Sequence, residues 1–221
     1  MSRIAVVLPA LGLVSILFGA IAAPAVAAAG HKQPLECPPA HAKQITVDKQ
    51  AVIYKAPGPP EDGEEGFPTL FACAFGHRRY MLGEPAEFGP EGGGGIARET
   101  LVGVMVAYEK SLIPAPNGHD SFVIYVRDLL TGRIVHEAPT AEAKFPGEVG
   151  KDSAEKIVLK RDGSVAWIDQ TEPHEFQIRA VDKTGNRLLA VSGDIVPRSL
   201  SLKGSTLRWI EDGKPTYAIL H

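Results

Sequence analysis

A short phrase recurs four times along this chain, and each copy carries a large aromatic residue near its end. The four aromatics are Tyr54, Tyr108, Trp167 and Trp209. Each copy consists of an apolar segment, a tight polar or glycine break, and a second segment whose last third holds the aromatic. Apolar runs that are separated by such breaks indicate paired β-strands. We therefore interpret the phrase as the first half of a repeated β-unit.

The residues that follow the second and third copies supply the other half of the unit. Both copies continue as a β-rich run to an aspartate, Asp128 or Asp182, followed within a few residues by Thr-Gly and a second apolar run. Glycine accepts a positive φ at little steric cost, and aspartate bonds backbone amides within a turn, so each segment predicts a hairpin. The unit therefore has four strands. The fourth copy keeps only "KPTYAIL", which predicts three strands there.

Repeats of four short strands are typical of the blades of β-propellers. We predict an all-β protein, a small propeller-like ring of about four repeated four-stranded units. A β-sandwich built from the same hairpins is the alternative. The shortened last unit leaves an exposed strand edge unless the N-terminal segment around Cys37 covers it.

The phrases "VAWID" and "LRWIE", together with the hairpin "IRAVDKTG", resemble the blades of bacterial secreted β-propeller-like proteins, including uncharacterised exported families. The resemblance covers nearly all of the chain after its first thirty residues. It implies a propeller-like fold and an exported location. It carries over no catalytic residue.

The first 29 residues have the layout of a secretory signal peptide. One basic residue, Arg3, precedes an apolar run and then small residues, and cleavage fits after Ala27 or Ala29. We predict a signal peptide at 1–29 and an all-β repeat domain at 30–221, located outside the cytoplasm, secreted or in the cell envelope. The alternative is an uncleaved membrane anchor; after cleavage we expect no membrane association.

The chain has two cysteines, Cys37 and Cys73, and both follow the apolar run. In an exported chain the usual fate of two cysteines is one disulfide bond. We therefore predict that Cys37 and Cys73 are joined. No C-x-x-C spacing supports a metal or redox pair instead.

Charge and motifs give little sign of chemistry. The net charge is −3 without long blocks of either sign, so we expect no nucleic-acid partner. There is no G-x-S-x-G, and the seven histidines show no ligand spacing. Four acids flank the repeated strands and are interpreted as turn or strand-end residues: Asp162, Asp169, Glu211 and Asp212. We assign no catalytic, metal or cofactor residue and expect no cofactor.

The repeated aromatics admit two interpretations. They either line a saccharide-binding surface or, as equivalent positions in every unit, hold neighbouring units together in the core. We favour the core, and with it a monomeric binding or interaction module for an unknown protein or saccharide ligand rather than an enzyme. The alternative is a secreted hydrolase with carboxylates gathered at the axis of the ring.

Overall fold

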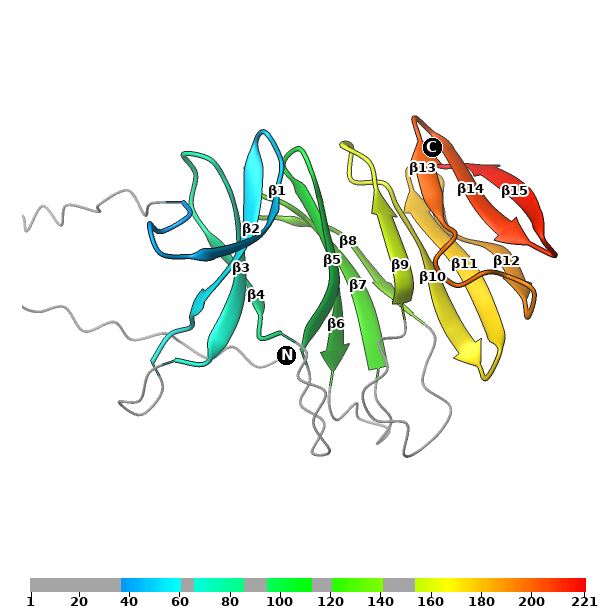
Figure 1. Ribbon diagram of the computed structural model, residues 1–221. Helices are drawn as coiled ribbons and strands as arrows, with labels where there is room; N and C mark the ends of the chain where they lie inside the picture. Colours follow the sequence, from blue (N-terminus) through cyan, green and yellow to red (C-terminus); the bar gives the residue numbers. More distant parts are fainter. Residues whose placement is uncertain (1–36, 61–65, 86–94, 113–120, 141–153) are drawn as a thin grey trace, which may run out of the picture. The chain divides into compact units, whose positions relative to one another are not determined.

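Short antiparallel strands make up all the regular secondary structure of the described residues, which are 37–60, 66–85, 95–112, 121–140 and 154–221 of the computed structural model (Figure 1). The predicted signal peptide at 1–29 lies outside these residues. No helix in the described ranges is long and apolar enough to cross a membrane. The prediction of an all-β chain is confirmed.

The strands form four sheets, each built from consecutive strands. Sheet 1 contains β1 (Lys43–Val47), β2 (Ala51–Pro57), β3 (Pro68–Ala74) and β4 (Tyr80–Gly83). Sheet 2 contains β5 (Ile96–Val102), β6 (Met105–Leu112), β7 (Ser121–Asp128) and β8 (Ile134–Pro139). Sheet 3 contains β9 (Ala154–Leu159), β10 (Val165–Glu172), β11 (Glu175–Asp182) and β12 (Gly185–Ser192). Sheet 4 has three strands, β13 (Ser201–Lys203), β14 (Thr206–Glu211) and β15 (Lys214–Ile219). The predicted units of four strands, with a shortened last unit, are confirmed.

The aspartates of the predicted hairpins hold their turns as expected. Asp128 Oδ1 accepts a hydrogen bond of 2.8 Å from the backbone N–H of Leu130. Asp182 Oδ1 accepts one of 2.9 Å from the N–H of Thr184. These side chains satisfy turn amides that have no partner in the ladder. The β7–β8 and β11–β12 connections therefore follow directly from local sequence.

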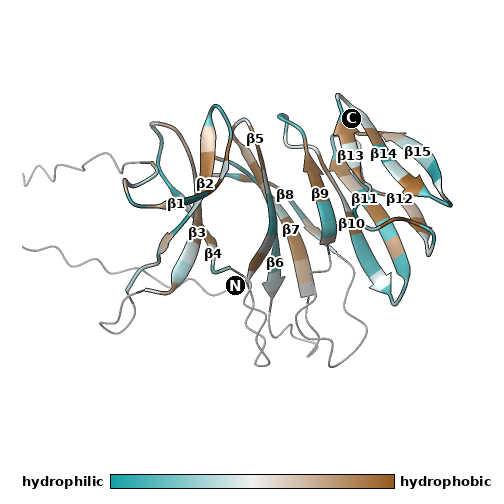
Figure 2. Cartoon of the chain, viewed as in Figure 1, coloured by the Kyte–Doolittle hydropathy of each residue, from teal (hydrophilic) through white to brown (hydrophobic). Residues whose placement is uncertain are grey.

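Hydrophobic clusters join each sheet to the next one along the chain. Ile53 of sheet 1 and Tyr108 of sheet 2 belong to one cluster, and Ile124 of sheet 2 shares another with Trp167 of sheet 3. A third contains Ile178 of sheet 3 and Trp209 of sheet 4. Figure 2 shows the hydrophobic colouring concentrated along the strands and hydrophilic colouring at several of their ends. No cluster of described residues combines sheets 1 and 4, so closure into a ring stays a prediction.

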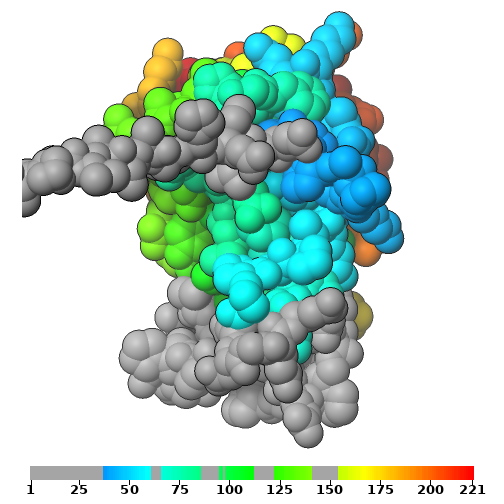
Figure 3. All heavy atoms as spheres, turned by 90° about the vertical axis from the view of Figure 1, so that its left-hand side faces the viewer, coloured from blue at the N-terminus to red at the C-terminus, as the bar shows by residue number. Residues whose placement is uncertain are grey.

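The disulfide covers one face of sheet 1. Cys37 is bonded to Cys73 of β3, with their Cα atoms 6.2 Å apart. Cys37 and Ala42 pack against a cluster that includes Tyr54 and Phe71. Figure 3 faces this end of the described chain, with its first residues in blue against the cyan and teal of sheet 1. The segment around Cys37 thus covers a face of sheet 1, and not the edge of the shortened last unit.

Strand β15 is the outer strand of sheet 4 and, among the described residues, pairs only with β14. The N–H of Leu220 bonds Ser205 on the β14 side, so by alternation the backbone groups of Ile219, Tyr217 and Pro215 point away from β14. Pro215 has no N–H to offer there. The carbonyl of Ile219 accepts a hydrogen bond of 2.9 Å from Arg187. A further strand would therefore find no donor at Pro215 and an acceptor at Ile219 that is already engaged.

Candidate ligand-binding site

The four repeated aromatics lie in the second strand of each sheet and are buried. Tyr54 and Trp167 are 0% exposed, Trp209 is 2% and Tyr108 is 3% exposed. A saccharide-stacking surface needs exposed rings, so these side chains are not placed to form one. They pack between or against sheets instead.

The two tryptophans share a polar contact with the acid two residues later. Trp167 Nε1 donates a hydrogen bond of 3.1 Å to Asp169 Oδ2, and Trp209 Nε1 donates one of 3.0 Å to Glu211 Oε2. A buried indole N–H needs such an acceptor, since leaving it unpaired costs free energy. Asp169 and Glu211 therefore serve the packing of their own units.

Asp162 and Asp212 lie in turns and also have local partners. Asp162 accepts a hydrogen bond from the N–H of Ser164 at 3.0 Å and pairs with Lys160 at 3.0 Å. Desolvation opposes its charged form, but the bonds from Ser164 and Lys160 outweigh this and lower the pKa of Asp162. Asp212 pairs with Lys214 in an exposed turn. Each of the four acids that stood out in the sequence thus has a local partner, and no group of three or more possible metal ligands occurs in the described ranges.

The first strands of sheets 2 and 3 each carry a β-bulge at the point where they approach each other. In β5 two residues, Arg98 and Glu99, oppose the single residue Tyr108 of β6. In β9 the extra residue is Glu155. It lies between Lys156, which pairs with Ile168 of β10, and Ala154, which pairs with Asp169. Arg98 has a φ of 53°, a left-handed conformation that costs a non-glycine residue on the order of 1–3 kcal/mol. Such bulges and strained residues re-aim side chains and are frequent beside functional sites.

Polar groups of sheet 2 hold the first residue of β9. Arg98 Nε donates a hydrogen bond of 2.7 Å to the carbonyl of Ala154, and Glu109 Oε1 accepts one of 3.0 Å from the Ala154 N–H. Glu109 is 1% exposed, and this bond satisfies one of its buried oxygens. The cost of the strained Arg98 backbone is thus offset by a bond that fixes β5 against β9.

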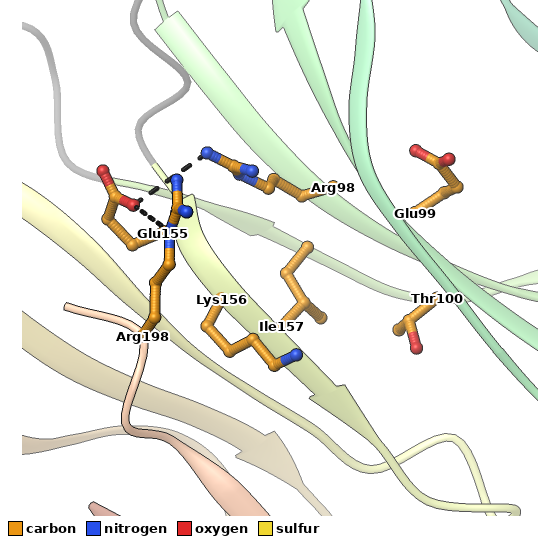
Figure 4. Close-up of a pocket in the computed structure, with 7 residues that line it drawn as sticks. All are labelled: Arg98, Glu99, Thr100, Glu155, Lys156, Ile157 and Arg198. Carbon is orange, nitrogen blue, oxygen red and sulfur yellow. Dashed lines mark hydrogen bonds and ion pairs between the residues drawn. The ribbon is translucent and has the colours of Figure 1, made fainter.

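A cavity of about 430 Å³ opens beside this junction. Its lining comes from the bulge of β5, the start of β9 and the segment that precedes β13: Arg98, Glu99, Thr100, Glu155, Lys156, Ile157 and Arg198. Figure 4 shows the guanidinium groups of Arg98 and Arg198 meeting at the carboxylate of Glu155. Arg198 Nε lies 3.4 Å from Glu155 Oε2, and Arg98 Nη2 lies 3.9 Å from the same oxygen. Three successive units therefore contribute to one charged cavity.

The lining has the chemistry of a polar binding site. It contains three cationic and two acidic side chains, no aromatic ring, and one apolar residue, Ile157. A cavity of this size accommodates a small ligand or one group of a larger ligand. No sequence pattern pointed to Arg98, Glu155 or Arg198, because the bulges and the approach of the segment before β13 depend on packing between units.

A second group of charged side chains has a structural role, because it holds the end of sheet 4 on sheet 3. The Asp182 carboxylate is fully buried and pairs with Arg187. Its Oδ2 also accepts a hydrogen bond from the N–H of His221 at 2.8 Å. Desolvation alone raises the pKa of Asp182, but the hydrogen bonds from Thr184, His221 and Arg187 lower it well below its usual range.

Two residues of the β9–β10 turn complete this contact, which we call the C-terminal clasp. Lys160 Nζ donates to the carbonyl of Leu220 at 3.2 Å, and Ser164 Oγ donates to the carbonyl of His221 at 2.8 Å. Asp162 and Asp182 also act electrostatically on His136 of β8. Desolvation outweighs their attraction and lowers the pKa of His136 below its usual 6.5. The clasp consists of side chains bound to backbone groups, which is a structural role.

No protein-family model matches the chain, and no curated protein is recognisably similar to it. The resemblance to exported propeller-like proteins therefore stays a prediction. What bears on function is the geometry of the cavity between β5 and β9.

Proposed function

We propose that the protein is an extracytoplasmic binding module that holds a small ligand, or one group of a larger ligand, in the cavity between β5 and β9. The observation that carries the proposal is the pair of bulged strands. Their bulges place Arg98 and Glu155 in the lining of one cavity, and Arg198 of the next unit completes it. The residues that stood out in the sequence have structural partners elsewhere. In this cavity, by contrast, charged side chains of three units border open space.

The location outside the cytoplasm rests on two features. The N-terminal 29 residues have the composition of a signal peptide, and Cys37 and Cys73 form a disulfide. Disulfides persist in oxidising compartments and are rare in the reducing cytosol. Both features are consistent with an exported protein.

A secreted hydrolase is the weaker proposal, because the acids near the cavity are engaged in structure. Glu155 is paired with two guanidinium groups, and Glu109 holds the backbone of β9. Asp169 accepts bonds from Trp167 and Gln177 within its own sheet. A glycosidase needs two carboxylates facing one bond of the substrate. These contacts favour binding over catalysis.

The test is retention of ligands from an envelope extract. The full chain, expressed with its N-terminal segment, is equilibrated with the extract across a dialysis membrane, and the bound small molecules are identified by mass spectrometry. The double variant Lys156→Ala/Arg198→Ala removes two cavity side chains that reach solvent. The control Lys203→Ala/Arg208→Ala removes the same charge from exposed positions of β13 and β14, outside the cavity.

We expect compounds that the wild type and the control retain and the cavity variant loses. Equal retention by all three proteins, or no retention by the wild type, would contradict the proposal. Fractionation of the expressing cells tests the location separately. A full-length protein with free thiols in the cytosol would overturn that part alone.

A further inference from the structure

The cavity between β5 and β9 is locally cationic on a protein that is acidic overall. Arg98, Lys156 and Arg198 outnumber Glu99 and Glu155 in its lining, whereas the whole chain has a net charge of −3. A concave site lined by one excess sign of charge attracts ligands of the opposite sign. The local excess therefore favours an anion.

The two arginines are arranged as an oxyanion site requires. Both approach a single oxygen, Glu155 Oε2, from different units (Figure 4). A guanidinium group has five N–H donors in a planar fork that matches the oxygens of carboxylate, sulfate and phosphate. Arg198 meets Glu155 through its Nε, and its side chain is 73% exposed. Glu155 thus occupies the place where an anionic oxygen of a ligand binds well.

The lining also argues against a neutral sugar. Saccharide sites commonly use an exposed aromatic ring as an apolar platform, and none lines this cavity. The four repeated aromatics are at most 3% exposed and belong to the core. Recognition here must come from charge and hydrogen bonds.

We propose that the cavity binds a ligand through an oxyanion group, a carboxylate, sulfate or phosphate, held by Arg98, Arg198 and Lys156. This inference rests on the binding function proposed above and names its ligand class. Glu155 competes with the ligand for the two guanidinium groups. It therefore sets the affinity of the site, and it keeps the arginines in place when no ligand is bound.

The test is an NMR titration of the full chain, in which amide shifts are followed at constant ionic strength. The probes are inorganic phosphate, sulfate and glucuronate, with glucose as the neutral counterpart of glucuronate. We expect saturable shifts in residues 98–100, 155–157 and 198 with at least one anion and none with glucose. The anion that binds most tightly distinguishes a phosphate source from a sulfated or carboxylated saccharide.

Two variants and one control identify the groups that bind. Arg198→Ala removes one charge-assisted donor and should weaken anion binding about tenfold. Glu155→Gln keeps the shape of the side chain but removes the negative charge that competes for both guanidinium groups, so the affinity should rise severalfold. Arg208→Ala makes the same charge change as Arg198→Ala on β14, outside the cavity, and should leave the affinity unchanged.

Three results would overturn the inference. Arg208→Ala could weaken anion binding as much as Arg198→Ala does, or Glu155→Gln could lower the anion affinity. The third result is amide shifts that appear only outside the cavity. Binding of glucose at the cavity without anion binding would overturn the ligand class and leave the binding function standing. Absence of any bound compound in both this titration and the extract experiment would remove the binding function itself. If Glu155→Gln does not fold, the comparison of Arg198→Ala with Arg208→Ala still decides, since both side chains are exposed.

Discussion

The carboxylate of Asp182 accepts a hydrogen bond of 2.8 Å from the backbone N–H of His221, which lies 39 residues later in the chain. The same carboxylate caps its own hairpin through Thr184 and pairs with Arg187. One buried side chain thus closes a turn of sheet 3 and holds the end of sheet 4. The C-terminal clasp depends on its charge.

Asp182→Asn should destabilise the protein, because a neutral amide accepts weaker hydrogen bonds and leaves Arg187 without its counter-ion. We expect the free energy of unfolding to fall by about 1–3 kcal/mol, measured by urea denaturation at pH 7. Asp212→Asn, which removes an exposed ion pair, should change it by less than about 0.5 kcal/mol. Because the pKa of Asp182 is lowered, its contribution to the free energy of unfolding is present above about pH 4 and is lost at lower pH. The free energy of unfolding of Asp182→Asn should therefore decline less in acid than that of the wild type. Equal stability of the two variants would exclude the clasp as a stabilising contact.

His136 should make stability depend on pH near neutrality. Burial lowers its pKa below 6.5, so the unfolded chain binds a proton there more readily than the folded one. The contribution of neutral His136 is therefore fully present above about pH 6.5 and is lost as the pH falls below it. NMR titration of the imidazole should give a pKa under 6.5, and His136→Gln should reduce the slope of stability between pH 7 and pH 5. A pKa of His136 above 6.5 would contradict the expectation.

The paired tryptophans should respond unequally to loss of their acids. Asp169 is 0% exposed and accepts bonds from both Trp167 and Gln177, so Asp169→Ala leaves two buried donors unpaired. We expect a loss of about 2–4 kcal/mol, from the penalty for each unsatisfied group. Glu211→Ala should cost less, because Glu211 is only partly buried and water can replace it. Chemical denaturation followed by tryptophan fluorescence measures both, and the reverse order would show that burial does not govern these pairs.

Gly132 should tolerate a side chain poorly. It has a φ of 78°, and a Cβ there would overlap the ring of Tyr80. Gly204 has a similar φ of 61° but no atom near the site of its Cβ. Gly204→Ala should therefore cost only the left-handed penalty of about 1–2 kcal/mol, and Gly132→Ala should cost clearly more. Thermal denaturation of the two variants compares them, and similar melting temperatures would mean that the Tyr80 ring moves aside.

The disulfide should stabilise the chain by holding the segment after Cys37 on sheet 1. It links residues 36 positions apart, for which chain entropy gives about 3–4 kcal/mol. The double variant Cys37→Ala/Cys73→Ala should lower the melting temperature and increase hydrogen exchange at Tyr54 and Phe71, which this segment covers. Intact mass after alkylation without reductant should show no modified thiol in the wild type. Two alkylated cysteines in protein from an oxidising compartment would refute the bond.

Local patterns predicted the strands, the aspartate turns and the core, and they did not predict the cavity. Asp128 and Asp182 act on amides two residues away, and Trp167 and Trp209 recur at one position of a repeated unit, so short stretches of sequence contain that information. The bulge at Arg98 is different, because the hydrogen bond that accompanies it is made to Ala154 of the next sheet, 56 residues away. Arg198 reaches Glu155 from 43 residues away. Contacts of this kind arise from packing between units, where a single sequence has no periodic signal.

The outer edge of β15 has a consequence for how molecules of this protein meet one another. An unprotected strand edge recruits strands of other chains and starts an intermolecular sheet. Pro215 denies such a strand a donor at one end, and Arg187 already occupies the carbonyl of Ile219 at the other. Only the groups around Tyr217 remain between them, which is too short a tract to fix the register of a foreign strand. The outer edge of β15 therefore offers a strand of a neighbouring molecule few free backbone groups with which to extend sheet 4.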